Sequence, residues 1–247
     1  MVHARVRPIG ILTAAVTALA ALTALTAPPA EAAQLPRGHD VSSHQRDVDW
    51  AATRAKGASF VYVKATESVG YRNPYFAGQY DGARGAGLIR GAYHFALPDR
   101  GPGEAQAAFF VRNGGAWSAD GWTLPPALDI EYNPYDRGKR CYGLSPARMV
   151  DWIRAFSDET HRLTGRRPVI YTTTHWWNQC TDGSTAFAAE HALWIARYRT
   201  REAGALPAGW STWTFWQYDN GGELPGDQNL FNGSSDRLRR FAQGSWV

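Results

Sequence analysis

The chain has 247 residues, of which 44% are hydrophobic and 19% are charged, and its formal net charge is +4. This length suits one large domain or two small ones. The mild charge and the lack of a basic run argue against a nucleic-acid partner.

The first 32 residues have the three-part pattern of a secretory signal peptide. Arg5 and Arg7 precede the apolar stretch "IGILTAAVTALAALTALTA", and "PPAEAA" offers a small-residue cleavage site. An uncleaved membrane anchor is the alternative, because the stretch is long enough to span a bilayer. We predict cleavage near Ala32 and secretion into the extracellular medium. Cleavage removes two basic residues and one acidic residue, which leaves a net charge of +3. No later segment is long and apolar enough to span a bilayer, so no stable membrane association is expected after cleavage.

Residues 33–247 alternate short apolar or aromatic runs with helical patterns, without a linker or repeat, and are expected to form one domain. The alternation predicts an α/β fold, and seven or eight strands favour a single TIM-like (β/α) barrel over an open doubly wound sheet. Strands are expected at 38–42, 59–65, 88–95, 126–132, 168–173, 192–198 and 213–218. Helices are expected at 48–56, 74–86, 103–113 and 145–164. Segments 174–191 and 199–212 read mostly as loops, so the barrel is expected to be irregular, with weakened helices in its second half.

The helix predicted at 145–164 has the clearest end signals. Ser145 is a suitable N-cap, Pro146 occupies the first helical position, and Gly165 follows the last turn. These residue types favour the two ends for different reasons: serine accepts from free backbone N–H groups, and glycine adopts the left-handed conformation that ends a helix.

Cys141 and Cys180 are the only cysteines, and neither belongs to a metal-binding spacing. In an exported protein they are expected to form one disulfide that closes a loop of about forty residues. Two buried free thiols are the alternative. Eleven tryptophans and eleven tyrosines are a second compositional signal. Such rings pack in cores, and they also stack on the apolar faces of sugars, so a groove for a glycan chain is expected.

Polar and aromatic side chains recur where the predicted strands end. In parallel barrels these ends form the rim on which functional groups gather. In chain order, the residues at these ends are Asp40, Glu67, Tyr93, Asp129 with Glu131, Tyr171, Tyr198, and Gln217 with Tyr218. The segment "PGDQNLFNG" follows the last strand and contributes Asp227. We therefore expect one acidic site at this end of the barrel.

The fourth predicted strand carries the strongest chemical signal. Alternation places Ala127, Asp129 and Glu131 on one face of the strand and the apolar residues between them on the other. Two carboxylates at neighbouring same-face positions hinder each other's ionisation, so one stays protonated near neutral pH. A protonated acid beside an anion is what cleavage of a glycosidic bond requires. The alternative is a solvated or salt-bridged pair of acids at a strand end.

Eight ordered motifs resemble the Ch-type lysozymes, glycoside hydrolase family 25. They are "GHDVSSHQ", "FVYVKATES", "GAYHF", "ALDIEY", "RPVIYT", "LWIARY", "WTFWQY" and "DQNLFNG", and the resemblance covers essentially residues 37–241. The resemblance implies a secreted N-acetylmuramidase that cleaves the β-1,4 bond between N-acetylmuramic acid and N-acetylglucosamine in peptidoglycan.

The resemblance also implies roles for individual residues. Glu131 matches the family's general acid, and Asp129 matches the carboxylate that stabilises the substrate's 2-acetamido group, a substrate-assisted variant of two-carboxylate chemistry. Asp40 and Asp227 match acids that flank the cleft floor and complete the predicted catalytic set. Residues expected to bind substrate are Tyr93, Tyr132, Tyr171, Tyr198, Gln217, Tyr218 and Glu67. No cofactor or metal is implied, and the expected partner of a monomeric enzyme is the glycan strand of peptidoglycan.

Several other residues have a simpler structural interpretation. His39 and His94 alternate away from Asp40 and Tyr93, so both are expected to be packing residues. Trp194 is expected in the core. Period-two alternation places Trp216 and Tyr218 on the face opposite Gln217, so one of these two sets must pack against helices. "GLSPA" lacks the second glycine of a nucleophile elbow, and "GARGAG" precedes a strand instead of following one, which argues against a dinucleotide site.

Three other functions remain open from the sequence. A chitinase-like hexosaminidase also carries D-x-E on a barrel strand. A catalytically silent barrel that only binds wall glycan is the second, and carboxylates at all four matched positions argue against it. A metal hydrolase using Asp129 and Glu131 as ligands is the third, and it lacks histidines in a ligand spacing.

Overall fold

The structure is a computed structural model that describes residues 1–4 and 34–245. Its contacts divide the chain into two units, Met1–Ala33 and Gln34–Val247. Of the first unit only residues 1–4 are described, and they form neither helix nor strand. The predicted signal peptide therefore lies, from residue 5 onward, outside the described residues.

Eight strands close into a barrel, which confirms the predicted α/β barrel over an open sheet. The ring follows the order β1, β2, β4, β5, β6, β7, β8, β9, and β1 pairs with both β2 and β9. A ninth, two-residue strand, β3, pairs antiparallel with β2. The strands in the described residues are β1 (Arg37–Val41), β2 (Ala58–Glu67), β3 (Tyr71–Arg72), β4 (Ile89–Phe95), β5 (Ala127–Asp129), β6 (Val169–Thr172), β7 (Leu193–Ala196), β8 (Phe215–Asp219) and β9 (Asp227–Phe231).

The closing strand β9 differs from the other seven strands of the ring. It runs antiparallel to both of its neighbours, β1 and β8. The sequence analysis did not predict it as a strand, because Asp227, Gln228 and Asn229 make its first half polar. As an antiparallel strand, β9 begins at the rim where the parallel strands end, and this brings Asp227 to that rim.

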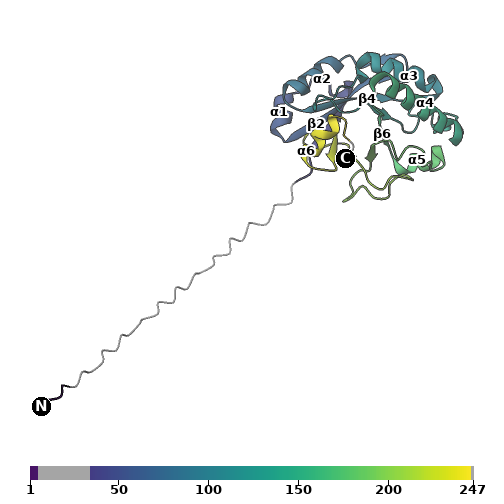
Figure 1. The fold of residues 1–247 in the computed structure, drawn as a ribbon. Helices are drawn as coiled ribbons and strands as arrows, with labels where there is room; N and C mark the ends of the chain where they lie inside the picture. Colours follow the sequence, from purple (N-terminus) through teal and green to yellow (C-terminus); the bar gives the residue numbers. More distant parts are fainter. Residues whose placement is uncertain (5–33, 246–247) are drawn as a thin grey trace. The chain divides into compact units, whose positions relative to one another are not determined.

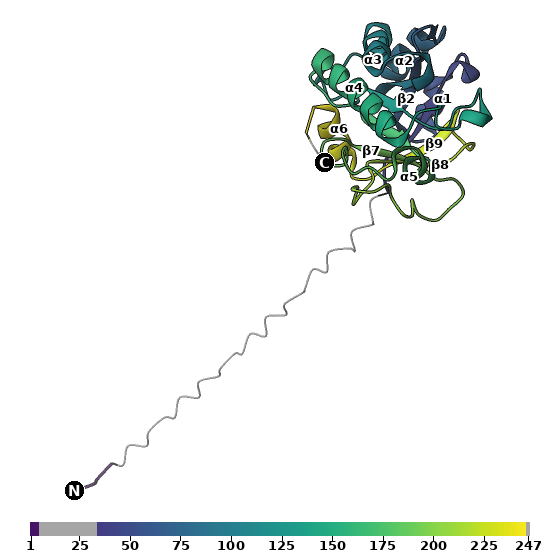
Figure 2. The ribbon, with the colours of Figure 1, turned by 90° about the vertical axis from the view of Figure 1, so that its right-hand side faces the viewer.

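Helices cover the barrel unevenly, as expected. Among the described residues the α-helices are α1 (Trp50–Ala55), α2 (Phe76–Gly85), α3 (Gly103–Phe110), α4 (Pro146–Thr164), α5 (Thr174–Thr181) and α6 (Ser235–Ala242). Figures 1 and 2 show α1 to α4 gathered around one side of the barrel, while long loops connect the strands of the second half. The predicted ends of α4 are confirmed: the Ser145 side chain accepts from the Arg148 N–H, and Gly165 is left-handed.

Two helices were not predicted. The segment 174–191 was expected to be mostly loop, and its first part instead forms α5, capped by the Thr173 hydroxyl. Trp176 and Trp177 on α5 are fully buried, so tertiary packing stabilises a helix whose own residues are weak helix formers. The C-terminal α6 begins at the Ser234 cap and buries Leu238 and Phe241. The loop predicted at 199–212 contains no helix.

The predicted alternation of β5 is confirmed. Ala127 belongs to the cluster inside the barrel, together with Phe60 and Phe215. Leu128 and Ile130 belong to the outer cluster, which also contains residues of α3 and α4. Because successive side chains point to opposite faces of a strand, Asp129 shares the inner face with Ala127. Glu131 lies two residues beyond the end of β5 and lines the same cavity as Asp129.

Large aromatic rings fill the lower part of the barrel interior. Phe60 and Tyr62 occupy space that glycines leave free: a Cβ on Gly38 would come within 2.5 Å of the Phe60 ring, and one on Gly91 would collide with Tyr62. Phe215 packs at this level against Phe60, with ring centroids 5.2 Å apart.

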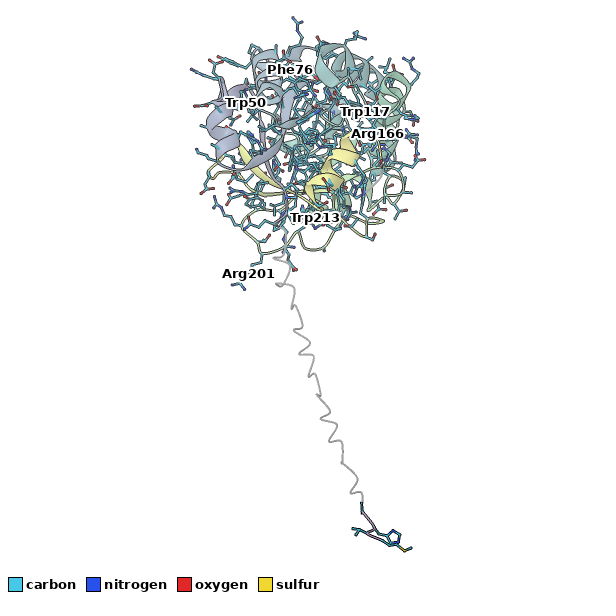
Figure 3. The ribbon with its side chains drawn as sticks, turned by 60° about the vertical axis from the view of Figure 1, so that its left-hand side comes forward. Trp50, Phe76, Trp117, Arg166, Arg201 and Trp213 are labelled. Atoms are coloured by element: carbon cyan, nitrogen blue, oxygen red, sulfur yellow. A yellow bond between two sulfur atoms is a disulfide. The ribbon has the colours of Figure 1, made fainter. Side chains whose placement is uncertain are left out.

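Helix α6 covers the base of the barrel. Its Phe241 packs against Phe215 and Phe231 at the base. In Figure 3, Trp117 and Arg166 lie near the C-terminal α6, drawn in yellow. The Arg166 guanidinium is 5.7 Å from the Trp117 ring centroid and 5.5 Å from that of Phe241. The base of the barrel is therefore packed with apolar and aromatic groups, and the cavity lined by acids lies at the other end.

The predicted disulfide between Cys141 and Cys180 is present, with a Cα–Cα distance of 5.5 Å. It joins the loop after β5 to α5. A search of the described helices finds none with the length and apolar character needed to cross a membrane.

Candidate active site

A cavity opens at the carboxyl ends of the parallel strands. It collects eight of the eleven residues predicted for catalysis or substrate binding: Asp40, Tyr93, Asp129, Glu131, Tyr171, Tyr198, Gln217 and Asp227. Six of these residues lie on six different strands of the ring, and the other two, Glu131 and Tyr198, follow β5 and β7. The sequence argument that strand ends converge on one rim is thus supported by the positions of these side chains.

The four acids enter the cavity as two pairs. Asp129 is the last residue of β5, which is shorter than the predicted strand 126–132, and Glu131 follows it by two residues; both side chains line the cavity. Asp40 is the next-to-last residue of β1 and stands opposite Asp227 in the antiparallel ladder between β1 and β9. The second pair therefore depends on the reversed direction of β9.

A buried hydrogen-bond network holds Asp40. Its Oδ2 atom accepts from Gln217 Nε2 and from Asn229 Nδ2, both at 2.7 Å. Gln217 Oε1 in turn accepts from the Tyr171 hydroxyl at 2.7 Å and from the Tyr198 hydroxyl at 2.6 Å. Because these side chains are joined by hydrogen bonds in series, the network fixes their rotamers on the cavity wall.

Burial raises the pKa of the Asp40 carboxyl to about 8, and the negative charge of Asp227 acts in the same direction. The hydrogen bonds from Gln217 and Asn229 oppose this rise only in part. Burial also raises the pKa of Asp227, with a contribution from Asp219. Near neutral pH this pair therefore retains a proton.

The Asp129–Glu131 pair also retains a proton near neutrality. Burial raises the pKa of Glu131 to about 7, against the opposing charge of Lys64. The pKa of Asp129 rises well above its ordinary value, first through burial and then through the charge of Glu131. Asp129 Oδ1 is buried and has no hydrogen-bond partner among the described residues. The two groups titrate as one unit that combines a proton donor with a carboxylate.

Aromatic rings form the floor of the cavity. Trp194 is buried, as predicted, and also lines the cavity. Its indole packs against Tyr93 and Tyr171, with ring centroids 6.2 Å and 4.9 Å away, and its Nε1 donates to Asn229 Oδ1 at 2.7 Å. The floor thus joins the apolar interior below to the polar network above.

Three predicted substrate-binding residues lie outside the cavity lining. The Tyr132 hydroxyl contacts His175 Nδ1 at 2.6 Å and Gln179 Oε1 at 2.7 Å on α5. Tyr218 packs against Trp216 on the outer face of β8. Of the two sets on this strand, Trp216 and Tyr218 therefore face outward, and Gln217 faces the cavity. Glu67 forms an ion pair with Lys64 at 2.7 Å instead of facing the cavity.

The cavity also contains residues that the sequence analysis did not select. They are Val41, Ser42, His44, Gln45, Lys64 and Phe95. Lys64 follows Phe60 and Tyr62 at intervals of two along β2, so period-two alternation predicts its inward face. The residues after β1 lie on a short 3-10 turn, η1 (Ser43–Gln45), where no such period applies.

The two histidines set aside in the sequence lie away from the cavity. His39 Nδ1 contacts the Pro225 carbonyl at 2.7 Å. His94 contacts Thr66 Oγ1 at 2.8 Å and Gln106 Oε1 at 3.0 Å. Burial lowers the pKa of each imidazole to about 4, so both are neutral packing residues near neutral pH.

Comparisons with known proteins agree with this geometry. The profile of glycosyl hydrolases family 25 matches residues 39–227. Lysozyme M1 of Streptomyces globisporus is 45% identical over 214 residues, which cover 85% of this chain and 72% of that protein. The N,O-diacetylmuramidase of Chalaropsis sp is 44% identical over 211 residues, 84% of this chain and 99% of that protein.

Solved structures extend the likeness to the fold. The structure of a muramidase from Acremonium alcalophilum matches with a TM-score of 0.83 and 51% identity, covering 85% of this chain and all of that chain (100%). The acidic cavity at the rim of a closed barrel, the family profile and the extent of these matches lead to one conclusion: the chain belongs to glycosyl hydrolases family 25 and is a glycoside hydrolase.

Proposed function

We propose that the chain is a secreted muramidase that hydrolyses the β-1,4 bond between N-acetylmuramic acid and N-acetylglucosamine in peptidoglycan. Its family membership and its relatives named lysozyme and N,O-diacetylmuramidase support this substrate. The observation that carries the proposal is the Asp129–Glu131 pair at the carboxyl end of β5, in a cavity shared with Asp40 and Asp227. The surrounding tyrosines supply rings and hydroxyls suited to a sugar chain.

In the proposed mechanism, Glu131 donates its proton to the glycosidic oxygen as the bond from C1 breaks. The carbonyl oxygen of the substrate's own 2-acetamido group attacks C1, and Asp129 accepts a hydrogen bond from the acetamido N–H and stabilises the positive charge. Water then attacks C1, Glu131 takes a proton from it, and the acetamido group is restored. Two displacements at C1 retain the β configuration. Proton NMR of the first-formed anomer tests this outcome, and an initial α-anomer would exclude substrate assistance.

Asp40 and Asp227 complete the proposed catalytic set from the opposite wall. With the pKa of both raised by burial, they limit the negative charge that faces the Asp129–Glu131 pair. Tyr93, Tyr171 and Tyr198 are proposed to contact the sugar. We place Gln217 with them as the residue that orients two of the tyrosyl hydroxyls and Asp40.

Secretion is part of the proposal. It is supported by the signal-peptide pattern of residues 1–32 and by a disulfide, which is stable in an oxidising compartment. The mature enzyme is proposed to act as a monomer on glycan strands. N-terminal sequencing of the protein recovered from culture medium tests cleavage near Ala32, and an intact N-terminus would contradict it.

The principal test replaces the proposed acid. Glu131→Gln keeps the size of the side chain and removes its proton donor, so kcat/KM for wall glycan should fall by about 10²–10⁴-fold, the usual contribution of general acid catalysis. Mass spectrometry of the wild-type digest should identify N-acetylmuramic acid at the new reducing ends. Glu104→Gln, an exposed position in the first turn of α3, is the matched control and should retain wild-type activity.

The same experiments separate the alternatives. Unchanged lysis by Glu131→Gln would exclude Glu131 as the acid. Release of sugar from chitin at a rate comparable with clearing of bacterial walls would favour a chitinase-like hexosaminidase. Wild-type protein that binds walls without generating reducing ends would indicate a silent binding barrel.

A further inference from the structure

Lys64 is the one lysine or arginine among the described residues that line the cavity. It lies near the end of β2, beyond Phe60 and Tyr62 on the inner face, and its side chain is 15% exposed. A largely buried ammonium group needs partners that hold it in place. Those partners do not come from the four acids of the cavity.

The Lys64 ammonium contacts one carboxylate and two aromatic rings. Its Nζ donates to Glu67 Oε2 at 2.7 Å and lies 4.6 Å from the ring centroid of Phe95 and 5.5 Å from that of Tyr71. Residues three apart on a regular strand point to opposite faces. The pairing of β2 with β4 shifts register between Lys64 and Thr66, and this irregularity allows Glu67 to reach Lys64.

The second oxygen of Glu67 is held by the loop after β5. The Tyr135 hydroxyl donates to Glu67 Oε1, and the Tyr135 ring is 58% exposed. The Arg100 guanidinium lies 4.5 Å from the centroid of this ring. A continuous chain of contacts therefore connects an exposed tyrosine through Glu67 to the ammonium in the cavity.

We propose that Glu67 and Tyr135 are positioning residues that hold the Lys64 ammonium in the cavity beside Asp129 and Glu131. The inference rests on the proposed function, and it gives Glu67 a role different from direct substrate binding. Each carboxylate oxygen of Glu67 has one donor, so the ion pair has a single favoured geometry.

The charge so placed acts on the acid pair. Burial raises the pKa of both Asp129 and Glu131, and the positive charge of Lys64 opposes that rise. For Glu67 itself, burial acts to raise the pKa, but the hydrogen bonds from Lys64 and Tyr135 outweigh it and the pKa is lowered. Glu67 therefore remains a carboxylate throughout the neutral range, and the ion pair persists.

The test measures kcat/KM against pH for a soluble glycan fragment, because intact walls change their own charge with pH. Removing the ammonium in Lys64→Met makes ionisation of Glu131 harder, so its pKa rises. The alkaline limb of the pH profile, where kcat/KM falls as Glu131 loses its proton, should then move to higher pH by about one unit, as expected for loss of a nearby opposite charge. Lys64→Arg should return the limb toward the wild-type position.

Tyr135→Phe is the sharpest variant, since it removes one exposed hydroxyl and changes no charge near neutral pH. It should move the alkaline limb in the same direction as Lys64→Met, by a smaller amount. Glu159→Gln is the matched control, because it disrupts another i,i+3 ion pair, with Arg162, on α4. Its profile should coincide with that of the wild type.

A limb of Tyr135→Phe that coincides with the wild-type limb would overturn the proposal, as would an unmoved limb in Lys64→Met. Carbon-13 NMR titration of the Glu131 carboxyl reports the same shift without turnover. An inactive wild type with the expected titration shifts would refute the proposed function and leave the positioning role standing, so the two failures are distinguishable.

Discussion

The two ends of the barrel interior differ although the same strands build them. At the base, the inner faces carry Phe60, Phe215 and Phe231, which are almost completely buried. At the rim, the inner faces carry acids and amides. On β9 a single strand contains both kinds of residue, with Phe231 at the base and Asp227 at the rim.

The difference shows where the fold gains stability and where it loses some. Buried rings at the base are favourable through apolar burial and close packing. Buried carboxyls at the rim are unfavourable in their charged forms, and their raised pKa values are the sign of that cost. A stable base therefore allows the rim to hold groups that by themselves would destabilise the fold.

The largest expected effect on stability lies at the base. Phe231→Ala removes a ring that packs 5.3 Å from Phe215 and 6.2 Å from Phe241. The free energy of unfolding should fall by about 3–5 kcal/mol, the usual cost of such a truncation. Denaturant unfolding measures it. At temperatures where the variant is folded, kcat/KM should stay near that of the wild type. A large loss of activity without a loss of stability would contradict the assignment of stability to the base and of activity to the rim.

A smaller effect of opposite sign is expected at the rim. The pKa of Asp40 is raised in the folded state, so its contribution to stability is present at acidic pH and is lost as the pH rises toward about 8. Asp40→Asn removes this titration. Its Tm should exceed that of the wild type at pH 8 and by much less at pH 5, with about 2–4 °C for each kcal/mol gained.

Activity of Asp40→Asn should fall even as its stability rises. Thermal unfolding at the two pH values, together with kcat/KM, checks both parts. A Tm difference that is the same at pH 5 and pH 8 would show that burial of the Asp40 charge does not limit the stability of the rim.

The smallest expected effect is a pH dependence of the unmodified enzyme. With the pKa of Glu131 raised to about 7, the proton donor is present below neutral pH and is lost as the pH rises. The alkaline limb of kcat/KM should accordingly have its midpoint near pH 7. A midpoint near the ordinary glutamate pKa would mean that the rim does not perturb Glu131.

Much of this architecture could be predicted from the sequence because the signals are local. The alternation in "ALDIEY" placed Asp129 and Glu131 on the inner face, and the capping residues of α4 marked both of its ends. The same alternation applied to β2 predicts an inward Lys64. The Trp-rich α5 and the polar β9 were missed, because packing and strand pairing override the weak local preferences of these segments.

By itself, the sequence determined which chemistry reaches the strand ends and on which face of each strand it lies, because side-chain periods and helix caps depend on neighbours a few residues away. Only the tertiary structure decided that β9 closes the ring in the reverse direction, setting Asp227 opposite Asp40, and that Tyr135 reaches Glu67 across 68 positions of chain. Strand register and loop contacts of this kind depend on pairings between distant segments, for which local patterns carry no information.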